Sequence, residues 1–209
     1  MPSPLIPLFP LQVVVFPRTR LPLHIFEERY KEMIGAAIRD ESEFGMVLAK
    51  DDGIVNAGCT VRVEKVVERY PDGRLDILAR GQRRFEIVSL DQDKDYLQAE
   101  VAFFEDDDLA PVPGELREEA LAHYREMAGL ASVREHGEPD FADPQLSFQL
   151  AQAVPDLDFL NQLLRQRSET LRLKQLNHYL ARYVPRQKIV EHARDIAPTN
   201  GFGGRPAGL

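Results

Sequence analysis

With 209 residues and 44% hydrophobic content, the chain can bury a core of its own, as one large domain or two small ones. Its net charge of −8 argues against a generally nucleic-acid-binding surface, and no apolar stretch approaches the roughly 20 residues of a membrane helix. A single cysteine excludes an internal disulfide, a cysteine zinc cluster and a CxxC redox pair.

The first four residues carry no basic leader followed by an apolar run and a small-residue cleavage site. A secretory signal combines these three features. We therefore expect a cytoplasmic protein with no membrane span.

Residues 5–104 are dominated by the two-residue period of β-strands. Val61 and Val63 alternate with charged neighbours, and the Pro-Asp-Gly-Arg sequence at 71–74 predicts a hairpin. Gly81 predicts a bulge or bend, and a last strand is expected over 97–103. Several short strands that share so few residues predict a sheet that closes or curls.

One helix interrupts this β-rich region. Between residues 27 and 39, Tyr30, Ile34 and Ile38 recur at helical spacing.

Cys59 lies in an alternating strand pattern, which favours a buried and inert thiol over a nucleophile.

A change of composition follows the last predicted strand. Four acidic residues at 105–108 precede Pro111, Pro113 and Gly114, a sequence that solvates well and packs poorly. We place a boundary there. The expected organisation is a β-rich domain over 1–109, a helical subdomain over 110–197 and a flexible tail over 198–209.

The predicted helices of the second part have recognisable ends. One contains Leu116 and Ala120, and another follows Asp143 as a cap and ends near Val154. Asp156 or Asp158 caps the third. The last begins near Ser168 and should end or kink at Pro185.

Charge is distributed unevenly along this second part. Residues 105–160 hold 14 acidic and 3 basic side chains, whereas residues 161–209 hold 3 acidic and 9 basic ones. The two stretches are expected to pack close together and compensate each other.

Signatures of catalysis and of metal binding are missing. No glycine-rich loop precedes a Lys-Ser or Lys-Thr pair, no serine stands in a GxSxG elbow, and the five histidines show no HExxH spacing. The aspartates at 91, 93 and 95 lack the glycine and terminal glutamate of a calcium loop. We expect no enzyme activity, no cofactor and no metal.

The first hundred residues carry an ordered set of motifs. Residues 4–11 read PLIPLFPL, residues 15–17 read VFP, and residues 21–30 read LPLHIFEERY. FGMVL at 44–48, GCTV at 58–61, PDGR at 71–74 and GQRRF at 81–85 follow in the same order. This set resembles the amino-terminal domain of Lon proteases, and the later helices are similar to the helical subdomain of bacterial members.

The resemblance implies a fold and a role. It implies a β-rich PUA-like pseudo-barrel followed by helices, in the α+β class, and the binding of protein substrates. Arg18 departs from the pattern, because the family usually has glycine after Val-Phe-Pro. The sequence given ends where a full Lon protease continues, so we expect a stand-alone member without ATPase or protease modules.

Prolines at 4, 7, 10, 17 and 22 oppose regular central pairing and favour apolar side chains near a rim. We therefore predict that an unfolded protein or peptide binds at Phe9, Leu11, Phe16 and Leu21. The alternative place for each of these side chains is the barrel core. The bound client could be passed to a separate protease, as by an adaptor, or kept from aggregating, as by a chaperone. The sequence does not define the oligomeric state.

RNA binding is a second hypothesis. It follows from the PUA-like resemblance and from basic residues on the last helices, namely Arg165, Arg172, Lys174 and Arg182. The alternative for these residues is a solvated face or a partner for the acidic stretch. Fold analogy alone is weak support for a function, so we rank this hypothesis below protein binding.

Overall fold

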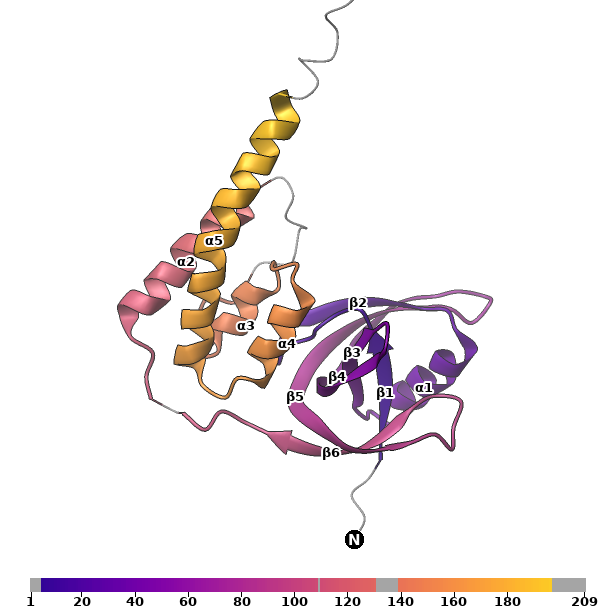
Figure 1. Cartoon of the computed structure of the whole chain (residues 1–209). Coiled ribbons are helices and arrows are strands. Elements are labelled where there is room, and N and C mark those ends of the chain that lie inside the picture. Colours follow the sequence, from indigo (N-terminus) through magenta and orange to yellow (C-terminus); the bar gives the residue numbers. More distant parts are fainter. Residues whose placement is uncertain (1–4, 109, 131–138, 197–209) are drawn as a thin grey trace, which may run out of the picture.

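A six-stranded sheet and five helices make up the described part of the chain, residues 5–108, 110–130 and 139–196 of a computed structural model (Figure 1). The strands are β1 (Ile6–Leu11), β2 (Arg20–Ile25), β3 (Phe44–Lys50), β4 (Gly53–Arg69), β5 (Leu75–Asp91) and β6 (Gln98–Phe104). The helices are α1 (Glu28–Arg39), α2 (Gly114–Ala128), α3 (Leu146–Ala151), α4 (Leu157–Arg165) and α5 (Glu169–Ile196). The α+β class is confirmed, and the tail predicted over 198–209 lies outside the described residues.

The sheet curls until it meets itself. Its order is β2-β5-β4-β3-β1-β6, and β5 also pairs with β6, so that five strands close a ring. Among the six described strands, β1 and β3 form the one parallel pair, with Leu8 opposite Gly45. Among the described strands β2 pairs only with β5 and is therefore an edge strand. The expected closure of the sheet is confirmed.

The predicted hairpin joins the two longest strands. Arg69 at the end of β4 lies opposite Leu75 at the start of β5, and the amide of Tyr70 donates to the carbonyl of Arg74 at 3.0 Å. Gly73 takes a φ of 84°, a conformation that glycine adopts without steric cost. The turn chemistry at 71–74 therefore sets the register of this pair.

The bulge predicted near Gly81 is also present. Cys59 pairs with Arg84, but Val61 pairs with Gly81, so β5 holds one more residue than β4 over this interval. Strand β5 nevertheless continues without interruption to Asp91.

A tight turn at residues 16–19 packs against this part of β5. The amide of Arg18 donates to the carbonyl of Gly81 at 2.8 Å, and the amide of Gly81 donates to Thr19 at 2.9 Å. A Cβ atom at position 81 would lie 2.0 Å from the carbonyl oxygen of Phe16. Arg18 itself has a φ of 63°, which explains why the resemblance expects glycine at this position.

Aromatic and aliphatic side chains fill the barrel. The ring of Phe9 lies 4.2 Å from that of Tyr30 in α1 and 6.5 Å from that of Phe44 in β3. Met33 and Ile34 of the same helix are almost fully buried. The apolar face of α1 thus contributes directly to the barrel core, as its helical spacing predicts.

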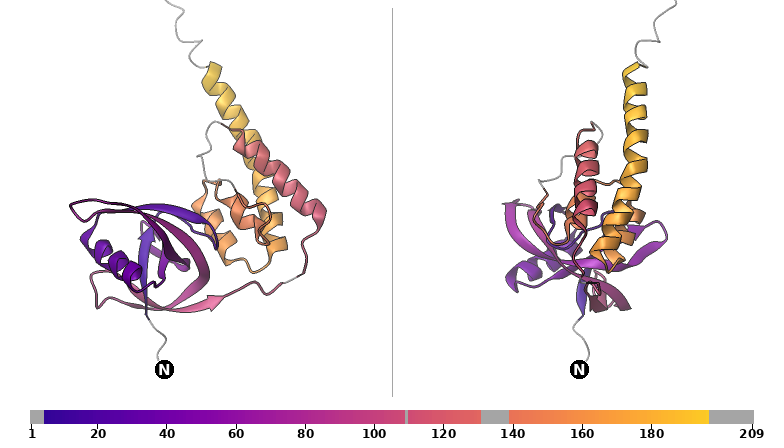
Figure 2. Two further views of the ribbon diagram at one scale, coloured as in Figure 1. Left: turned by 180° about the vertical axis from the view of Figure 1, so that it is seen from behind. Right: turned by 90° about the vertical axis from the view of Figure 1, so that its left-hand side faces the viewer.

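The remaining helices form a second body beside the sheet, and the end of α5 extends away from it (Figures 1 and 2). Helices α2 and α5 lie side by side, since Asn177 Nδ2 donates to Glu119 at 2.9 Å and Lys188 binds Glu126 at 3.0 Å. The ion pair between Lys188 and Glu126 confirms the predicted pairing of the acidic stretch with the basic stretch.

Two predictions about helix ends are wrong in detail. Helix α3 begins at Leu146, so Gln145 and not Asp143 is its N-cap residue; the Asp143 carboxylate instead accepts from Arg18 and from the Gln145 amide. Helix α3 also ends at Ala151, before Val154. Asp156 does cap α4, accepting from the amide of Phe159 at 3.0 Å.

Helix α5 does not end at Pro185 but continues to Ile196. Proline removes one backbone donor, which leaves the carbonyl of Ala181 without its helical partner. Ala181 and Pro185 are both exposed, so water can satisfy that carbonyl. The position of the proline on the solvent face allows the helix to pass through it.

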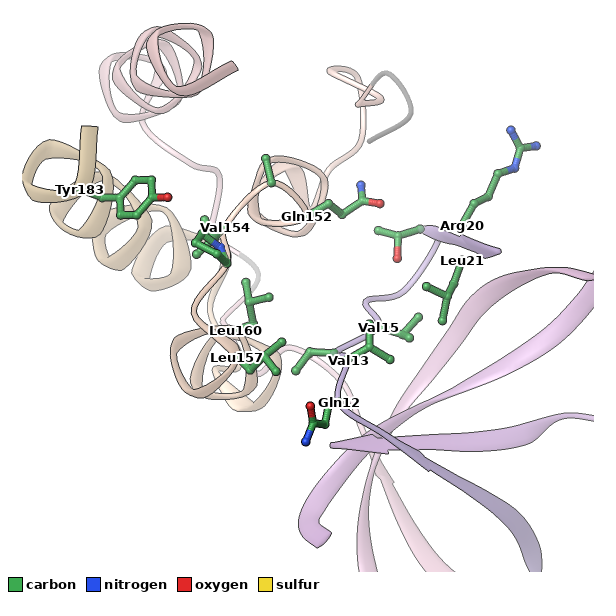
Figure 3. A pocket seen from close by; sticks show the side chains of 14 residues that line it. Gln12, Val13, Val15, Arg20, Leu21, Gln152, Val154, Leu157, Leu160 and Tyr183 are labelled. Atoms are coloured by element: carbon green, nitrogen blue, oxygen red, sulfur yellow. The ribbon is translucent and has the colours of Figure 1, made fainter. Parts of the chain in front are cut away.

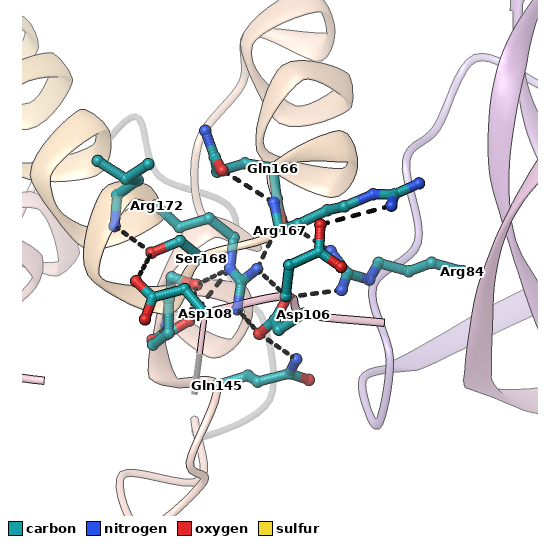
Figure 4. Close-up of polar contacts among 12 residues, drawn as sticks. Arg84, Asp106, Asp108, Gln145, Gln166, Arg167, Ser168 and Arg172 are labelled. Carbon is teal, nitrogen blue, oxygen red and sulfur yellow. Dashed lines mark hydrogen bonds and ion pairs between the residues drawn. The ribbon is translucent and has the colours of Figure 1, made fainter. Parts of the chain in front are cut away.

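A buried ionic network holds the two bodies together (Figure 4). Arg84 of β5 donates to Asp106 at 2.6 Å and to the carbonyls of Leu164 and Gln166 at 3.1 and 2.8 Å. Arg172 of α5 donates to both oxygens of Asp106 at 2.7 Å. Because both arginine side chains are 1% exposed or less, the network fixes how the helices dock on the barrel.

The rest of the network balances its charge. Glu169 accepts from Arg172 at 2.8 Å and from the hydroxyl of Ser147 at 2.6 Å. The Phe148 ring lies 4.3 Å from the Arg172 guanidinium and stacks on Phe16 at 4.9 Å between centroids. Two arginines thus face two carboxylates, and the aromatic pair shields them from water.

Candidate functional site

An aliphatic groove of about 360 Å³ opens where the two bodies meet (Figure 3). One wall comes from the segment between β1 and β2 and from the start of β2, and the other from the segment around α4. Figure 3 shows Val13 pointing toward Leu157 across the groove. Its aliphatic lining includes Val13, Val15, Leu21, Val154, Leu157 and Leu160.

Local sequence explains how each wall forms. On the barrel side, Pro10 and Pro17 bracket residues 12–16, which form no strand and are therefore free to face the helices. On the helical side, the Asp156 cap starts α4 at Leu157, and Leu160 follows at a spacing of three residues. Residues three apart share one face of a helix, so both leucines point into the groove.

The lining is exposed in part. Val13, Leu21, Leu157 and Tyr183 are half-buried, whereas Leu160 is only 5% exposed. The groove therefore has an apolar floor and an accessible rim. Burying such a rim under another apolar group would release about 25 cal/mol per Å².

Two of the predicted binding residues are not available to a ligand. Phe9 is 5% exposed and packs on Tyr30, and Phe16 is 1% exposed and stacks on Phe148. Their aromatic rings serve the barrel core and the junction of the two bodies. Both side chains therefore lie in the core, which was the alternative position considered for them.

The other two predicted residues have different positions. Leu21 lines the groove, whereas Leu11 is half-buried against the core and does not line it. The groove residues that sequence reasoning missed are Val13 and Val15 and the helical group Val154, Leu157 and Leu160. The run of three valines at 13–15, beside the prolines, could have indicated one wall of the groove. The helical residues on the opposite wall carry no comparable sequence signal.

The predicted basic surface loses one of its members. Arg172 is fully buried and neutralised by Asp106 and Glu169, so it cannot reach a phosphate. The Nη2 atom of Arg165 lies 3.7 Å from a carboxylate oxygen of Glu86. Of the four predicted residues, only Lys174 and Arg182 are exposed and have no acidic partner among the described residues. This leaves a weak electrostatic basis for RNA binding.

Cys59 is buried, and desolvation raises the pKa of its thiol to about 12. The thiolate that acts as a nucleophile or metal ligand is therefore suppressed. Within the described ranges, no group of three or more His, Cys, Asp and Glu residues is placed to hold a metal ion.

None of the helices described by the structure has the length and apolar character needed to cross a membrane.

A closed β-ring with a docked helical body defines an α+β domain, and an aliphatic groove lies at the junction. The family model of the ATP-dependent protease La (LON) substrate-binding domain matches residues 5–192. The chain belongs to this family, and the match spans both the barrel and the helices.

Curated relatives include the Lon proteases of Parabacteroides distasonis, 29% identical over 110 residues, and of Anaeromyxobacter dehalogenans, 30% identical over 126 residues. These alignments cover 48% and 56% of the chain but only 13% and 14% of the relatives. The chain therefore corresponds to a small fraction of the length of the proteases that it matches.

Two solved structures share the fold. The Lon N-terminal domain protein from Xanthomonas campestris aligns with a TM-score of 0.66 and 27% identity, over 83% of this chain and 96% of that one. The N-terminal domain of the Mycobacterium avium complex Lon protease gives a TM-score of 0.60 at 17% identity, over 86% of this chain and 100% of that one.

Proposed function

We propose that this protein is a non-catalytic recognition module that binds unfolded or partly folded protein segments. The binding site is the aliphatic groove between a β-rich domain, residues 1–109, and a helical subdomain, residues 110–197. Its cellular role is that of an adaptor or chaperone-like binder in protein quality control, in the cytoplasm. A separate protease would receive the client in the adaptor case.

The aliphatic lining of the groove is the observation that carries this proposal. Val13 and Leu157 face each other across it with accessible side chains, and polar groups stand at its ends. Sites that bind extended or helical peptides combine such apolar pockets with polar rims. Membership of a substrate-binding domain family supports the same reading.

The β2 strand supplies a second contact for a peptide. As an edge strand, it presents backbone groups that β5 does not use, and its residues Arg20 and Leu21 line the groove. An extended client could place an apolar side chain in the groove while its backbone follows this edge.

Binding of a fluorescently labelled, permanently unfolded protein to the purified chain tests the proposal by anisotropy. Leu157→Asp places a charge in the apolar groove, and we expect it to weaken binding at least about tenfold, which corresponds to about 1.4 kcal/mol. Val13→Asp should act in the same way from the opposite wall. Circular dichroism melts establish that each variant is folded.

Leu90→Asp is the matched control, since Leu90 is 48% exposed on β5 and does not line the groove. It should bind clients as the unaltered chain does. The proposal fails if the unaltered chain binds no unfolded protein. It also fails if both folded groove variants bind the unfolded protein as tightly as the unaltered chain does.

A further inference from the structure

The aliphatic groove is the middle of three adjoining hollows. One neighbour, of about 620 Å³, shares Gln12 and Leu157 with it. The other, of about 450 Å³, shares Thr19, Arg20 and Gln152. Because the shared residues differ, the two neighbours adjoin the aliphatic groove at different sides. Figure 3 shows Gln12 and Arg20 at opposite ends of the lining segment.

The hollow beside Gln12 is acidic. It is lined by Asp51 and Asp52 from the turn between β3 and β4 and by Asp156 and Asp158 at the start of α4. Lys50 is the one cation among its lining residues, and its ammonium group binds Asp158. Four carboxylates thus face one ammonium group.

Two of these carboxylates make no direct hydrogen bond or ion pair with a described residue. Asp156 caps α4 and Asp158 pairs with Lys50. Asp51 and Asp52 have exposed side chains without a hydrogen bond or ion pair to any residue that the structure describes, and Asp52 attracts Lys50 only at longer range. Their negative charge is available to a cation that enters the hollow.

The hollow beside Arg20 has the opposite excess. Arg18, Arg20 and Arg80 line it together with Asp140 and Asp143. Arg18 is held by Asp143, and Arg20 by Glu64. Arg80 makes no hydrogen bond or ion pair with a carboxylate in the described ranges. Its guanidinium attracts Glu64, which Arg20 already binds, only at longer range, so Arg80 can still bind an anion.

From this arrangement we infer that the groove selects its peptide by charge pattern as well as by hydrophobicity. The preferred segment has an aliphatic or aromatic residue at its centre, Lys or Arg on the flank that meets Asp51 and Asp52, and Asp or Glu on the flank that meets Arg80. This inference rests on the proposed function and deepens it, because it names the class of segment that the same groove takes.

The physical basis is electrostatic complementarity. Opposite charges across an interface favour one register and one direction of binding and disfavour like-charged partners. A single apolar pocket alone discriminates poorly among segments, since every unfolded protein carries apolar residues. Charged ends give the groove a means of distinguishing one segment from another and of orienting it.

The experiment uses labelled peptides of about ten residues, which span roughly 33 Å when extended. All share one apolar centre. Their flanks are basic then acidic, acidic then basic, all basic, all acidic, or neutral. We expect one of the two mixed orders to bind the full chain roughly tenfold more tightly than the neutral and the all-acidic peptides at low salt. The difference should shrink at about 1 M salt, where the Debye length falls to about 3 Å.

Two sets of variants test which hollow is responsible for each charge preference. Asp51→Asn with Asp52→Asn retains turn-forming side chains and should remove the preference for the basic flank. Arg80→Gln should remove the preference for the acidic flank. Both should leave binding of the neutral peptide unchanged.

The matched controls change the same net charge elsewhere. Asp93→Asn with Asp95→Asn removes two exposed carboxylates, and Arg69→Gln removes an exposed guanidinium, all at positions that do not line these hollows. They should preserve both preferences.

The inference is overturned if the neutral peptide binds as tightly as both mixed peptides at low salt. It is equally overturned if the control variants abolish the preferences as well as the groove variants do. In either case neutral binding that is lost in Leu157→Asp would leave the proposed function standing. If no peptide binds at all, both proposals fail.

Discussion

Arg18 and Asp143 form a paired contact that ties the turn after β1 to the segment leading into α3. Arg18 Nε lies 2.8 Å from one carboxylate oxygen of Asp143, and Nη2 lies 2.5 Å from the other. Burial alone would raise the pKa of Asp143, but hydrogen bonds from Arg18 and from the Gln145 amide outweigh it and lower the pKa. The carboxylate is therefore held charged at the junction of the two bodies.

This contact predicts an order of stability for two substitutions. Arg18→Ala and Arg18→Gly should both destabilise the fold, because each leaves the buried Asp143 carboxylate without its cation. The alanine variant should be the less stable by roughly 1 kcal/mol, since a φ of 63° strains alanine but not glycine. Urea unfolding measures the difference, and equal stability of the two variants would contradict the role of the backbone.

Arg172 should be far more important for stability than its helical neighbour Lys174. Arg172→Gln leaves Asp106 and Glu169 buried without their main cation, and we expect a loss of about 3–5 kcal/mol. Lys174→Gln, on the exposed face of the same helix, should change the free energy of unfolding by less than about 0.5 kcal/mol. Similar effects of the two substitutions in denaturant titrations would show that the network is dispensable.

Asp106 predicts a loss of stability in acid. Burial raises its pKa, but hydrogen bonds from Arg172 and Gln145 and the charges of both arginines lower it from 3.8 to about 2. The folded protein thus binds the proton more weakly than the unfolded chain. A contribution of roughly 2 kcal/mol is complete above about pH 4 and is lost as pH falls through about 2.

Urea titrations over that acidic range measure the effect. Asp106→Asn should flatten the pH dependence, and an unchanged slope would refute the assignment. Titration of Glu169 does not contribute to the same pH range. Burial raises its pKa above 4.5, so its contribution changes at higher pH and with the opposite sign.

Two glycines should respond to alanine in opposite directions. Gly81→Ala would place Cβ 2.0 Å from the carbonyl oxygen of Phe16, and we expect a loss of more than about 3 kcal/mol as the 16–19 turn is displaced. At Gly35, inside α1, a Cβ meets nothing within 4 Å, so Gly35→Ala should stabilise the fold by about 0.5–1 kcal/mol. Thermal melts distinguish these outcomes, and a stable Gly81→Ala variant would contradict the close approach.

Cys59 should be unreactive in the folded protein. Its thiol is fully buried, and burial raises its pKa to about 12. We expect negligible labelling by a thiol reagent in native buffer at about pH 8 and full labelling in denaturant. Rapid native labelling would mean that the barrel opens near β4.

The local elements were largely predictable because their signals are local. Alternating valines marked β4, the 71–74 turn marked its hairpin, and the spacing of Tyr30 and Ile34 marked α1. The ordered motifs pointed to the Lon amino-terminal family, and the family match confirms that resemblance.

The groove was not predictable in the same way. Its walls come from residues near 13 and near 157, and no periodic pattern relates positions so far apart. For an aromatic ring beside prolines, such as Phe16, the sequence leaves both an exposed and a core position open, and in the structure the ring packs on Phe148. Tertiary packing decides which apolar residues reach the surface, and a single sequence does not encode that choice locally.

The buried arginines were missed for a related reason. Arg172 lies among Lys174, Gln175 and other polar residues opposite a leucine stripe, a pattern typical of a solvated helix face. Only the approach of Asp106 from the segment after β6 makes its burial favourable. Such an arginine is recognisable only when its partner is already in place.

The closure of the ring has a consequence for how the protein folds during synthesis. Strand β1 pairs with β6, with Ile6 opposite Ala99, so the ring cannot close until almost half of the chain has been made. Contacts this distant in sequence slow folding, because loop entropy is lost before the contacts form. Until then the proline-rich start of the chain carries unprotected apolar side chains, Leu8 and Phe9 among them. A nascent molecule would at that stage resemble the clients we propose for the finished one, and its own early segments would compete for the grooves of copies already folded.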